Sequence, residues 1–315
     1  MKKHIEIILP VYNEEESLPN VFERLKKLSK ANSNYSWSFL FVNDGSSDKS
    51  IFLIKDICQK EEIFRYISFS RNFGHQAAVS AGVASANGDY IGIIDADLQD
   101  PPELFVEMAR ELDSGINLVY GTRKKRAGET WFKLFTAKMF YILLDKLSGV
   151  NIPRDTGDFR LFDKKVQNAF LKMPEYHRFI RGMIAWVGFK SKPLHYDRVE
   201  RFAGETKYPL WKMLKFALDG IFSFSNSPLK IANYIGTFTI FLGILGLIYI
   251  VCLRLFFDIY ITGTSTVLFF VLFIGGTQLL CIGIIGEYVG RIYEESKRRP
   301  LYIIEDKDLE EELNK

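Results

Sequence analysis

The chain has 315 residues, of which 48% are hydrophobic and 25% charged, and its formal net charge is +3 at pH 7. These averages exclude a disordered or collagen-like protein, and so small a charge gives no support for nucleic-acid binding. The three cysteines, Cys58, Cys252 and Cys281, form neither a disulfide framework nor a metal-spaced cluster, which is typical of a reducing compartment.

Short apolar runs and amphipathic stretches alternate over about the first 125 residues. The apolar runs predict strands at Ile5–Val11, Ser38–Val42, Arg65–Phe69, Tyr90–Ile94 and Asn117–Tyr120. Helical spacing predicts helices at Glu15–Lys30, Ser47–Glu61, Gln76–Ala86 and Pro101–Ser114, with Ser47, Asp48 and the two prolines at helix starts. This alternation predicts an α/β fold with a mostly parallel sheet and helices on both faces. Ligands of such sheets bind beyond the carboxyl ends of the strands.

The region from 126 to about 205 is less regular. The pattern predicts a helix at Trp131–Leu147, a polar turn at Arg154–Asp158, a strand, and a helix at Lys164–Lys172. Tyr208–Phe224 mixes aromatic residues with lysines, which favours a helix in the membrane interface, although a buried amphipathic helix has the same pattern.

Two stretches, Ile231–Leu253 and Ile259–Gly286, contain no charged residue. About 20 apolar residues cross a bilayer, so we expect two transmembrane helices; a buried helical hairpin is the alternative. Basic residues flank the pair, Lys207, Lys212, Lys215 and Lys230 before it and Arg291, Lys297, Arg298 and Arg299 after it. The positive-inside rule then places both termini in the cytoplasm.

These patterns predict four regions: a cytoplasmic catalytic domain at 1–205, interfacial amphipathic helices at 206–228, two transmembrane helices at 229–290, and a cytoplasmic C-terminal tail at 291–315. Glycines in the spans permit close helix packing within one chain or between chains, so a homo-oligomer is left open. They are Gly236, Gly243, Gly246, Gly275, Gly276, Gly283 and Gly286.

Carboxylates at the strand ends are the strongest chemical signal. Asp95 and Asp97 directly follow a buried strand, and two buried anions are costly without a cation, so the pair predicts bound Mg²⁺ or Mn²⁺. A capping turn before the Pro101 helix is the alternative reading. Glu14 and Asp44 follow two other strands and would reach the same edge, where they can accept hydrogen bonds from a base or ribose.

Three motifs in this order make the chain recognisable: Pro10-Val-Tyr-Asn-Glu-Glu15, Asn43-Asp-Gly-Ser-Ser-Asp48 and Asp95-Ala-Asp-Leu-Gln-Asp-Pro-Pro-Glu103. They resemble those of the family 2 inverting glycosyltransferases of the GT-A fold, which is Rossmann-like. The two spans and the ending from Gly286 to Ile304 are most similar to the bactoprenol glucosyltransferase branch of the polyprenyl-phosphate glycosyltransferases, which are related to dolichol-phosphate mannose synthase. Asn43 departs from the pattern, since many relatives carry Asp there.

The resemblance implies roles for individual residues. Pro10, Tyr12, Glu14 and Asp44 would contact the uridine-like part of a nucleotide sugar, and Asp95 and Asp97 would lie at the ribose, the diphosphate and the metal. Asp158 falls at the position of the proposed catalytic base, so Asp158 and Asp97 are the catalytic candidates. Arg201, Lys207 and Tyr208 fall in a loop over the donor or acceptor phosphate. His75 would border the nucleotide site, with a structural role as the alternative.

The charge balance requires fixed cations, because a sugar nucleotide and a lipid phosphate together carry about four negative charges and one metal ion carries two positive ones. The candidates are Arg123, Arg126, Arg160, Arg178, Arg181, Arg201 and Lys207. We favour Arg123, Arg160, Arg201 and Lys207 as phosphate-binding residues because they adjoin motif residues.

The resemblance therefore implies an integral protein of the bacterial inner membrane that transfers one sugar, with glucose favoured, from a UDP-sugar to undecaprenyl phosphate. We expect a single in-line displacement in which the acceptor phosphate, already an anion, hardly needs a base, so that Asp158 orients a hydroxyl or a cation. Donors carrying N-acetylglucosamine or mannose, a processive polysaccharide synthase, and a non-catalytic nucleotide-sugar-binding membrane protein are the alternatives.

Overall fold

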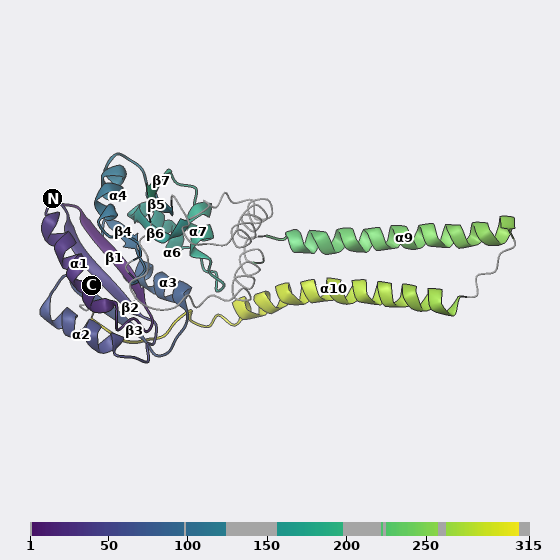
Figure 1. Ribbon diagram of the computed structural model, residues 1–315, viewed down its shortest axis with the longest axis horizontal. Coiled ribbons are helices and arrows are strands. Elements are labelled where there is room, and N and C mark those ends of the chain that lie inside the picture. The colour runs from purple at the N-terminus through teal and green to yellow at the C-terminus, as the bar shows by residue number, and fades with distance from the viewer. Residues whose placement is uncertain are drawn as a thin grey trace. The chain divides into compact units, whose positions relative to one another are not determined.

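A computed structural model describes residues 2–97, 99–123, 156–197, 222, 225–257 and 263–308. The chain forms two compact units (Figure 1). The first contains the N-terminal α/β region together with the C-terminal segment that begins at Arg299, and the second contains Phe216–Arg298. The predicted interfacial segment lies almost entirely outside the described residues.

The first unit is built on an eight-stranded mixed sheet in the order β7-β5-β6-β4-β1-β2-β3-β8. Its strands are β1 His4–Val11, β2 Ser36–Asn43, β3 Phe64–Phe69, β4 Tyr90–Ile93, β5 Leu118–Arg123, β6 Thr156–Asp163, β7 Ser191–Tyr196 and β8 Ile304–Lys307. The four neighbours β4, β1, β2 and β3 run parallel, as the strand–helix alternation predicts, whereas β6 and β8 are antiparallel to the strands beside them. All five predicted strands are present.

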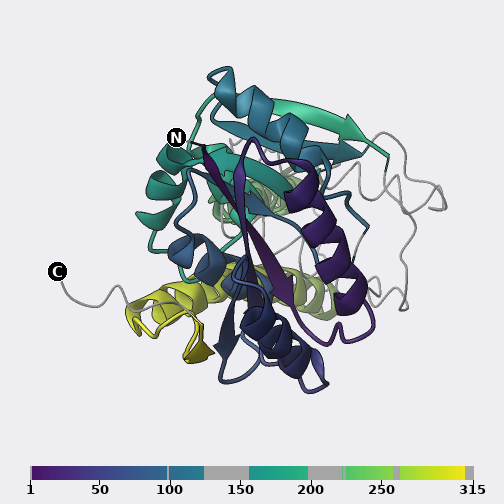
Figure 2. The same ribbon diagram turned by 90° about the vertical axis from the view of Figure 1, so that its left-hand side faces the viewer.

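Helices cover both faces of this sheet. They are α1 Leu18–Ala31, α2 Ser50–Lys60, α3 His75–Ser85, α4 Leu104–Asp113, α6 Lys164–Leu171 and α7 Ile180–Trp186. In Figure 2, α1 and α4 lie over the face of the sheet that is turned toward the viewer. The predicted starts of α2 and α4 were about three residues early, because the residues before Ser50 and Leu104 form turns; Asp48 Oδ1, for example, accepts the Ser50 N–H at 3.0 Å.

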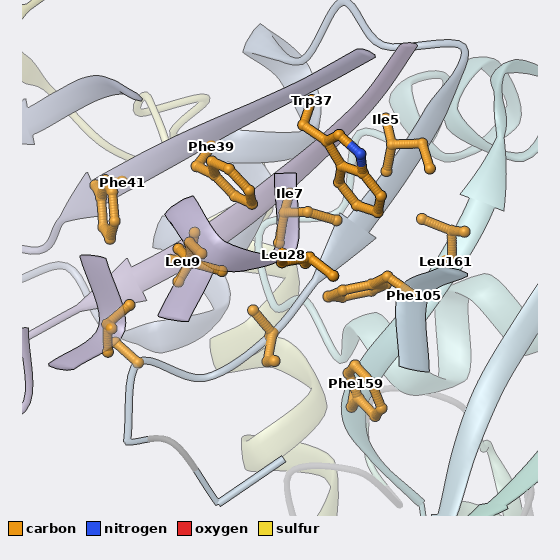
Figure 3. Packing of buried hydrophobic residues seen from close by; sticks show 14 of the residues in the cluster. Ile5, Ile7, Leu9, Leu28, Trp37, Phe39, Phe41, Phe105, Phe159 and Leu161 are labelled. Atoms are coloured by element: carbon orange, nitrogen blue, oxygen red, sulfur yellow. The ribbon is translucent and has the colours of Figure 1, made fainter. Parts of the chain in front are cut away.

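Alternation along the central strands divides the core between the two faces. Ile5, Ile7 and Leu9 of β1 point to one face, where they pack with aromatic residues of β2 and of α4 such as Phe39 and Phe105 (Figure 3). The other face is so tightly packed that a Cβ at Gly82 of α3 would lie 2.2 Å from Ile8 Cγ2. Each of these buried side chains contributes about 1.5–3 kcal/mol, which fixes the strand ends that carry the polar residues.

The second unit contains the two apolar helices, α9 Ser227–Phe257 and α10 Thr264–Ser296. Both are long and apolar enough to cross a membrane, with candidate spans Ser227–Leu253 and Phe270–Ser296 of 27 residues each and mean hydropathies of 2.3 and 1.8. At all the predicted packing glycines except Gly246, an added Cβ would meet nothing within 4 Å among the described residues. A Cβ added at Gly246 would lie 3.7 Å from Phe270 Cζ.

Candidate active site

The loop that follows β1 is fastened to the loop that follows β2. Asn13 has a left-handed backbone (φ 56°), donates its backbone N–H to Ser46 Oγ at 3.0 Å, and accepts the Ser47 N–H at its Oδ1 at 2.8 Å. The Glu14 carboxylate accepts a hydrogen bond from Ser17 Oγ at 2.9 Å, at the start of α1. The acids of the first two motifs are therefore held at one edge of the sheet, as the parallel arrangement predicts.

Two of the predicted nucleoside contacts, one at the end of β1 and one just after it, differ in exposure. Pro10 is buried within the strand, whereas Tyr12, the residue after the strand, is 49% exposed. The half-exposed ring of Tyr12 is available to a ligand at the end of β1. Pro10 can act on a ligand only through the backbone that it shapes.

Asp44 is buried and its carboxylate binds the turn between β3 and α3, which we call the 70–74 turn (Ser70–Gly74). Asp44 Oδ1 accepts the Phe73 N–H at 2.7 Å, and Oδ2 accepts the Gly74 N–H at 2.9 Å. Burial raises the pKa of Asp44, although these two N–H groups oppose the rise. Gly45 has a left-handed backbone (φ +63°), and a Cβ there would lie 2.3 Å from the Arg71 carbonyl carbon, so only glycine allows the two turns to approach this closely.

Asn43, where the family that the motifs resemble often has Asp, uses both its amide nitrogen and its amide oxygen. Its Nδ2 donates to Ser68 Oγ at 2.9 Å on the neighbouring strand, and its Oδ1 accepts the Ser46 N–H at 3.2 Å. The amide thus ties β2 to β3 and closes its own turn. The departure from the family pattern leaves the carboxylate of Asp44 in place.

Asp95 and Asp97 follow β4 at the same edge of the sheet. Burial raises the pKa of Asp95 to about 6; His75 opposes this rise, and the nearby charges of Asp158 and Asp97 add to it. Asp97 is buried and accepts the Gln99 N–H at 3.1 Å, which shapes the turn after the strand. Anions are therefore concentrated here, as the sequence predicts.

The described residues contain no group of three or more His, Cys, Asp or Glu side chains that could hold a metal ion by themselves. Mg²⁺ and Mn²⁺ commonly use one or two carboxylates and take their other ligands from substrate phosphates and water. Two neighbouring carboxylates that provide only oxygen atoms fit an ion bound in that way. Asp95 and Asp97 thus suit a metal that arrives with a diphosphate, and not one held by the protein alone.

Asp158, on β6, lies at the centre of a charged cluster. Its carboxylate accepts two hydrogen bonds from Arg181 of α7, Nε to Oδ1 at 2.8 Å and Nη2 to Oδ2 at 3.2 Å. His75 Nε2, at the start of α3, donates to Oδ2 at 3.0 Å and lies 3.9 Å from Asp95. Burial by itself would raise the pKa of Asp158, but Arg181 and His75 hold it well below its usual value.

The same cluster keeps His75 protonated. Burial lowers the pKa of His75, but the hydrogen bond to Asp158 and the charge of Asp95 outweigh this and raise it to about 9. The cluster therefore pairs an ionised carboxylate with two cations at neutral pH. Such a carboxylate accepts hydrogen bonds well and takes up a proton poorly.

Two of the predicted phosphate-binding arginines have partners inside the protein. Arg160 is buried and donates to the backbone oxygens of Gly157 (2.9 Å) and Asp158 (3.2 Å), and burial lowers its pKa to about 10. Arg123 lies beside Tyr196, whose hydroxyl donates to Asp100, and beside Gly157. The structure thus places both at β5 and β6 near Asp158, and phosphate binding by them stays a prediction. Arg201, Lys207 and Tyr208 lie outside the described residues.

The sequence did not single out the two cations that meet Asp158. The sequence makes Arg181 one of several candidate cations and does not favour it, and it places His75 beside the nucleotide site or in a structural role, without a link to Asp158. The position of His75 directly after the 70–74 turn was the available signal, since that turn follows a strand that ends at the same edge. Arg181 had no local signal, because α7 reaches Asp158 only through the tertiary fold.

Comparisons with known proteins identify the family of the chain. The sequence matches Glycosyl transferase family 2 over residues 6–170 and the GtrB C-terminal hairpin over residues 227–292. The uncharacterized glycosyltransferase YkcC of Bacillus subtilis (strain 168) is 48% identical over 97% of this chain and 95% of its own length. The bactoprenol glucosyl transferase of Shigella phage SfV is 37% identical over 96% of this chain and 98% of its own.

Among solved structures, glucosyl-3-phosphoglycerate synthase from Mycobacterium tuberculosis has a TM-score of 0.48 and 19% identity, covering 70% of this chain and 79% of that one. The chain belongs to glycosyl transferase family 2, and it combines a GT-A-like catalytic domain with a C-terminal hairpin of the GtrB type. The resemblance inferred from its motifs is thereby confirmed, and the protein is a glycosyltransferase.

Proposed function

We propose that this protein transfers a single glucose from UDP-glucose to undecaprenyl phosphate, with inversion, at the cytoplasmic face of the bacterial inner membrane. The product would be a lipid-linked sugar for the modification of a cell-surface glycan. Relatives named bactoprenol glucosyl transferase, similar over nearly their whole length, support the acceptor and the sugar. The two apolar helices support an acceptor that is supplied by a lipid bilayer.

One structural observation carries the proposal: acids and cations from distant parts of the chain meet at the carboxyl edge of the sheet. The site combines Asp95 from the loop after β4, Asp158 from β6, and the cations His75 and Arg181 from α3 and α7. Their mutual contacts form a compact site with both signs of charge. A transfer between two phosphate-bearing substrates needs acidic side chains to bind a metal ion and cationic side chains to bind phosphate oxygens.

Asp95 and Asp97 would hold Mg²⁺ or Mn²⁺ in this proposal. A divalent ion held by these two carboxylates would neutralise charge on the diphosphate that leaves with the nucleoside. The uridine and ribose would be positioned by residues at the ends of β1 and β2, namely Pro10, Tyr12, Glu14 and Asp44. Among these, Tyr12 is exposed and can contact the ligand directly, whereas Asp44 acts through the 70–74 turn.

The reaction is a single displacement at the anomeric carbon. An oxygen of the acceptor phosphate forms the new bond to that carbon while the bond to the diphosphate breaks, and the electron pair leaves with UDP. No proton has to be removed from the nucleophile, because the phosphate is already an anion. The fixed cations of the site stabilise the charge that moves during the step.

The low pKa of Asp158 agrees with a reaction in which no base has to take a proton from the nucleophile. We assign Asp158 to positioning: its carboxylate holds Arg181 and His75 in place, and Arg181 is then the side chain that faces phosphate oxygens. Arg123, Arg160, Arg201 and Lys207 remain the other predicted phosphate contacts. Of these, Arg160 would act in part through the backbone of β6, to which it donates.

Incubation of membranes containing the protein with labelled UDP-glucose and undecaprenyl phosphate tests the function. We expect a glycolipid that carries one sugar, with the β-anomer from an α-linked donor. A long polymer would indicate a processive synthase, and bound donor without product would indicate a non-catalytic protein. A donor screen that includes N-acetylglucosamine and mannose nucleotides decides the sugar, and a preference for either of these would overturn glucose.

A further inference from the structure

The chain returns to the catalytic domain after the second apolar helix. β8 pairs antiparallel with β3, with Ser68 opposite Asp306, and so covers an edge of the sheet. Asp306 accepts hydrogen bonds from Lys55 at 2.5 Å and from the Tyr66 hydroxyl at 3.0 Å. The segment is therefore anchored to the sheet both by backbone pairing and by side-chain contacts.

Tyr302, just before β8, begins a chain of aromatic contacts that ends at Asp44. Its ring stacks on Phe69 with centroids 5.0 Å apart and an interplanar angle of 11°. Phe69 meets Phe73 edge to face at 5.7 Å, and the Phe73 backbone N–H donates to Asp44 at 2.7 Å. The Ser70 N–H also donates to the Ile303 oxygen at 3.1 Å. Both ends of the 70–74 turn are thus tied, one to the C-terminal segment and the other to Asp44.

The remaining contacts of the turn lie nearer the surface. Ser70, Arg71 and Asn72 are exposed, and a Cβ at Gly74 would meet nothing within 4 Å. The Arg71 guanidinium lies over the Phe73 ring at 4.1 Å, and the Arg71 backbone approaches Gly45 closely. The buried ties of the turn are the aromatic contact at Phe69 and the Asp44 carboxylate, and an exposed turn opens more readily when such a tie is lost.

We infer that the C-terminal segment is part of the donor site, with Tyr302 as a positioning residue that fixes the 70–74 turn. The inference rests on the proposed function for its second half, the binding of a nucleotide sugar. Its first half, the ordering of the turn, is a property of the protein without any ligand. α10 ends at Ser296, six residues before Tyr302, so the segment that contacts the turn is the one that follows the second apolar helix in the sequence.

The consequence for the reaction is specific. The 70–74 turn supplies the N–H groups that hold Asp44, and it leads into His75, which contacts Asp158. Loosening the turn disturbs the predicted nucleoside contacts first, because Asp44 then loses both backbone donors. Donor KM should change more than kcat, since His75 retains its place at the start of α3.

The experiment compares Tyr302→Ala, Tyr302→Phe and Tyr302→Leu in the full-length protein in detergent, with Ile303→Ala as the matched control. The Ile303 side chain is 52% exposed, and its backbone oxygen, which binds the turn, survives the substitution. Hydrogen exchange of the peptide that covers residues 70–76 is measured without ligand. Kinetics with UDP-glucose are measured in parallel. Thermal unfolding shows whether each variant is folded.

We expect the 70–76 peptide to exchange about fivefold to tenfold faster in Tyr302→Ala, and donor KM to rise by a similar factor, the effect of losing one buried aromatic pair. Tyr302→Phe keeps the stack and should match the wild type, as should Ile303→Ala. If Tyr302→Ala does not fold, Tyr302→Leu decides, because it keeps apolar burial and loses stacking. Unchanged exchange and unchanged donor KM in a folded Ala or Leu variant would overturn the inference.

The two proposals fail separately in this design. A wild-type protein without any sugar transfer contradicts the proposed function, while the exchange data still decide whether Tyr302 orders the turn. Faster exchange with unchanged donor KM in an active enzyme would refute the link to the donor site.

Discussion

The pairing of Asp158 with Arg181 predicts that the two residues act as one unit. We consider Asp158→Asn, Arg181→Gln and the double variant. If Asp158 positions Arg181, either single substitution removes the same interaction, and the double variant should be no worse than the singles. If Asp158 is a base, Arg181→Gln leaves the carboxylate present and raises its pKa, so this variant should keep most of its activity.

The size of the effect follows from the geometry. Asp158 is buried and accepts two charge-assisted hydrogen bonds from Arg181, at 2.8 and 3.2 Å. Removing one partner of a buried ion pair costs about 3–5 kcal/mol. Because the Arg181 side chain keeps 25% of its exposure, solvent screening places the loss at the lower end, about 3 kcal/mol. That figure is a cost in folding stability; the expected loss in kcat comes from withdrawing one fixed cation from the charge that moves during the step, which is roughly 100-fold for a single donor.

Steady-state kinetics with saturating undecaprenyl phosphate and varied UDP-glucose measure this effect. We expect each single variant and the double variant to have kcat about 100-fold below the wild type, with donor KM changed less than about threefold. Lys192→Gln is the control, because it removes a cation from a solvent-exposed ion pair with Glu111 and should leave kcat within about twofold. Additive losses in the double variant, or near-normal turnover in Arg181→Gln, would refute the positioning role.

Three further predictions follow from the structure. EDTA should abolish transfer and added Mg²⁺ or Mn²⁺ should restore it, whereas Asp97→Asn should need a metal concentration about tenfold higher for half-maximal rate; activity that resists the chelator would contradict the metal assignment. Glu6→Ala should lower the thermal unfolding midpoint by about 5–10 °C with unchanged donor KM, since the fully buried carboxylate accepts two backbone N–H groups (2.6 and 3.2 Å) that would lose their partner. Gly45→Ala should raise donor KM at least about tenfold while the protein stays folded, because its Cβ would force apart the two turns at the donor site; a normal KM would show that these turns do not contact the donor.

The sequence was sufficient to locate the edge of the sheet that carries the site. Strands such as β1 and β4 are continuous apolar runs, and their ends are marked where polar residues begin, so the positions of Glu14 and Asp95 follow from chain order and parallel topology alone. These are local signals that the topology then brings together. The same reasoning could not separate the turns before α2 and α4 from the helices that follow them. Before α2, for example, the Asp48 carboxylate accepts the Ser50 N–H of its own helix and also the Glu15 N–H of a neighbouring loop, and the second contact has no local signal.

Contacts between distant segments could not be found in this way. Arg181 lies 23 residues from Asp158, on a short helix whose position depends on packing against the sheet, and no periodicity in either segment specifies the other. Tyr302 and Phe69 lie more than 200 residues apart in the sequence, and a four-residue strand with one apolar and three charged residues gives too weak a pattern to predict pairing with β3. In both cases the sequence locates the candidate site residues, whereas the fold supplies the residues that contact them. Candidate site residues at strand ends are therefore predictable from local order, and their contact partners require the tertiary structure.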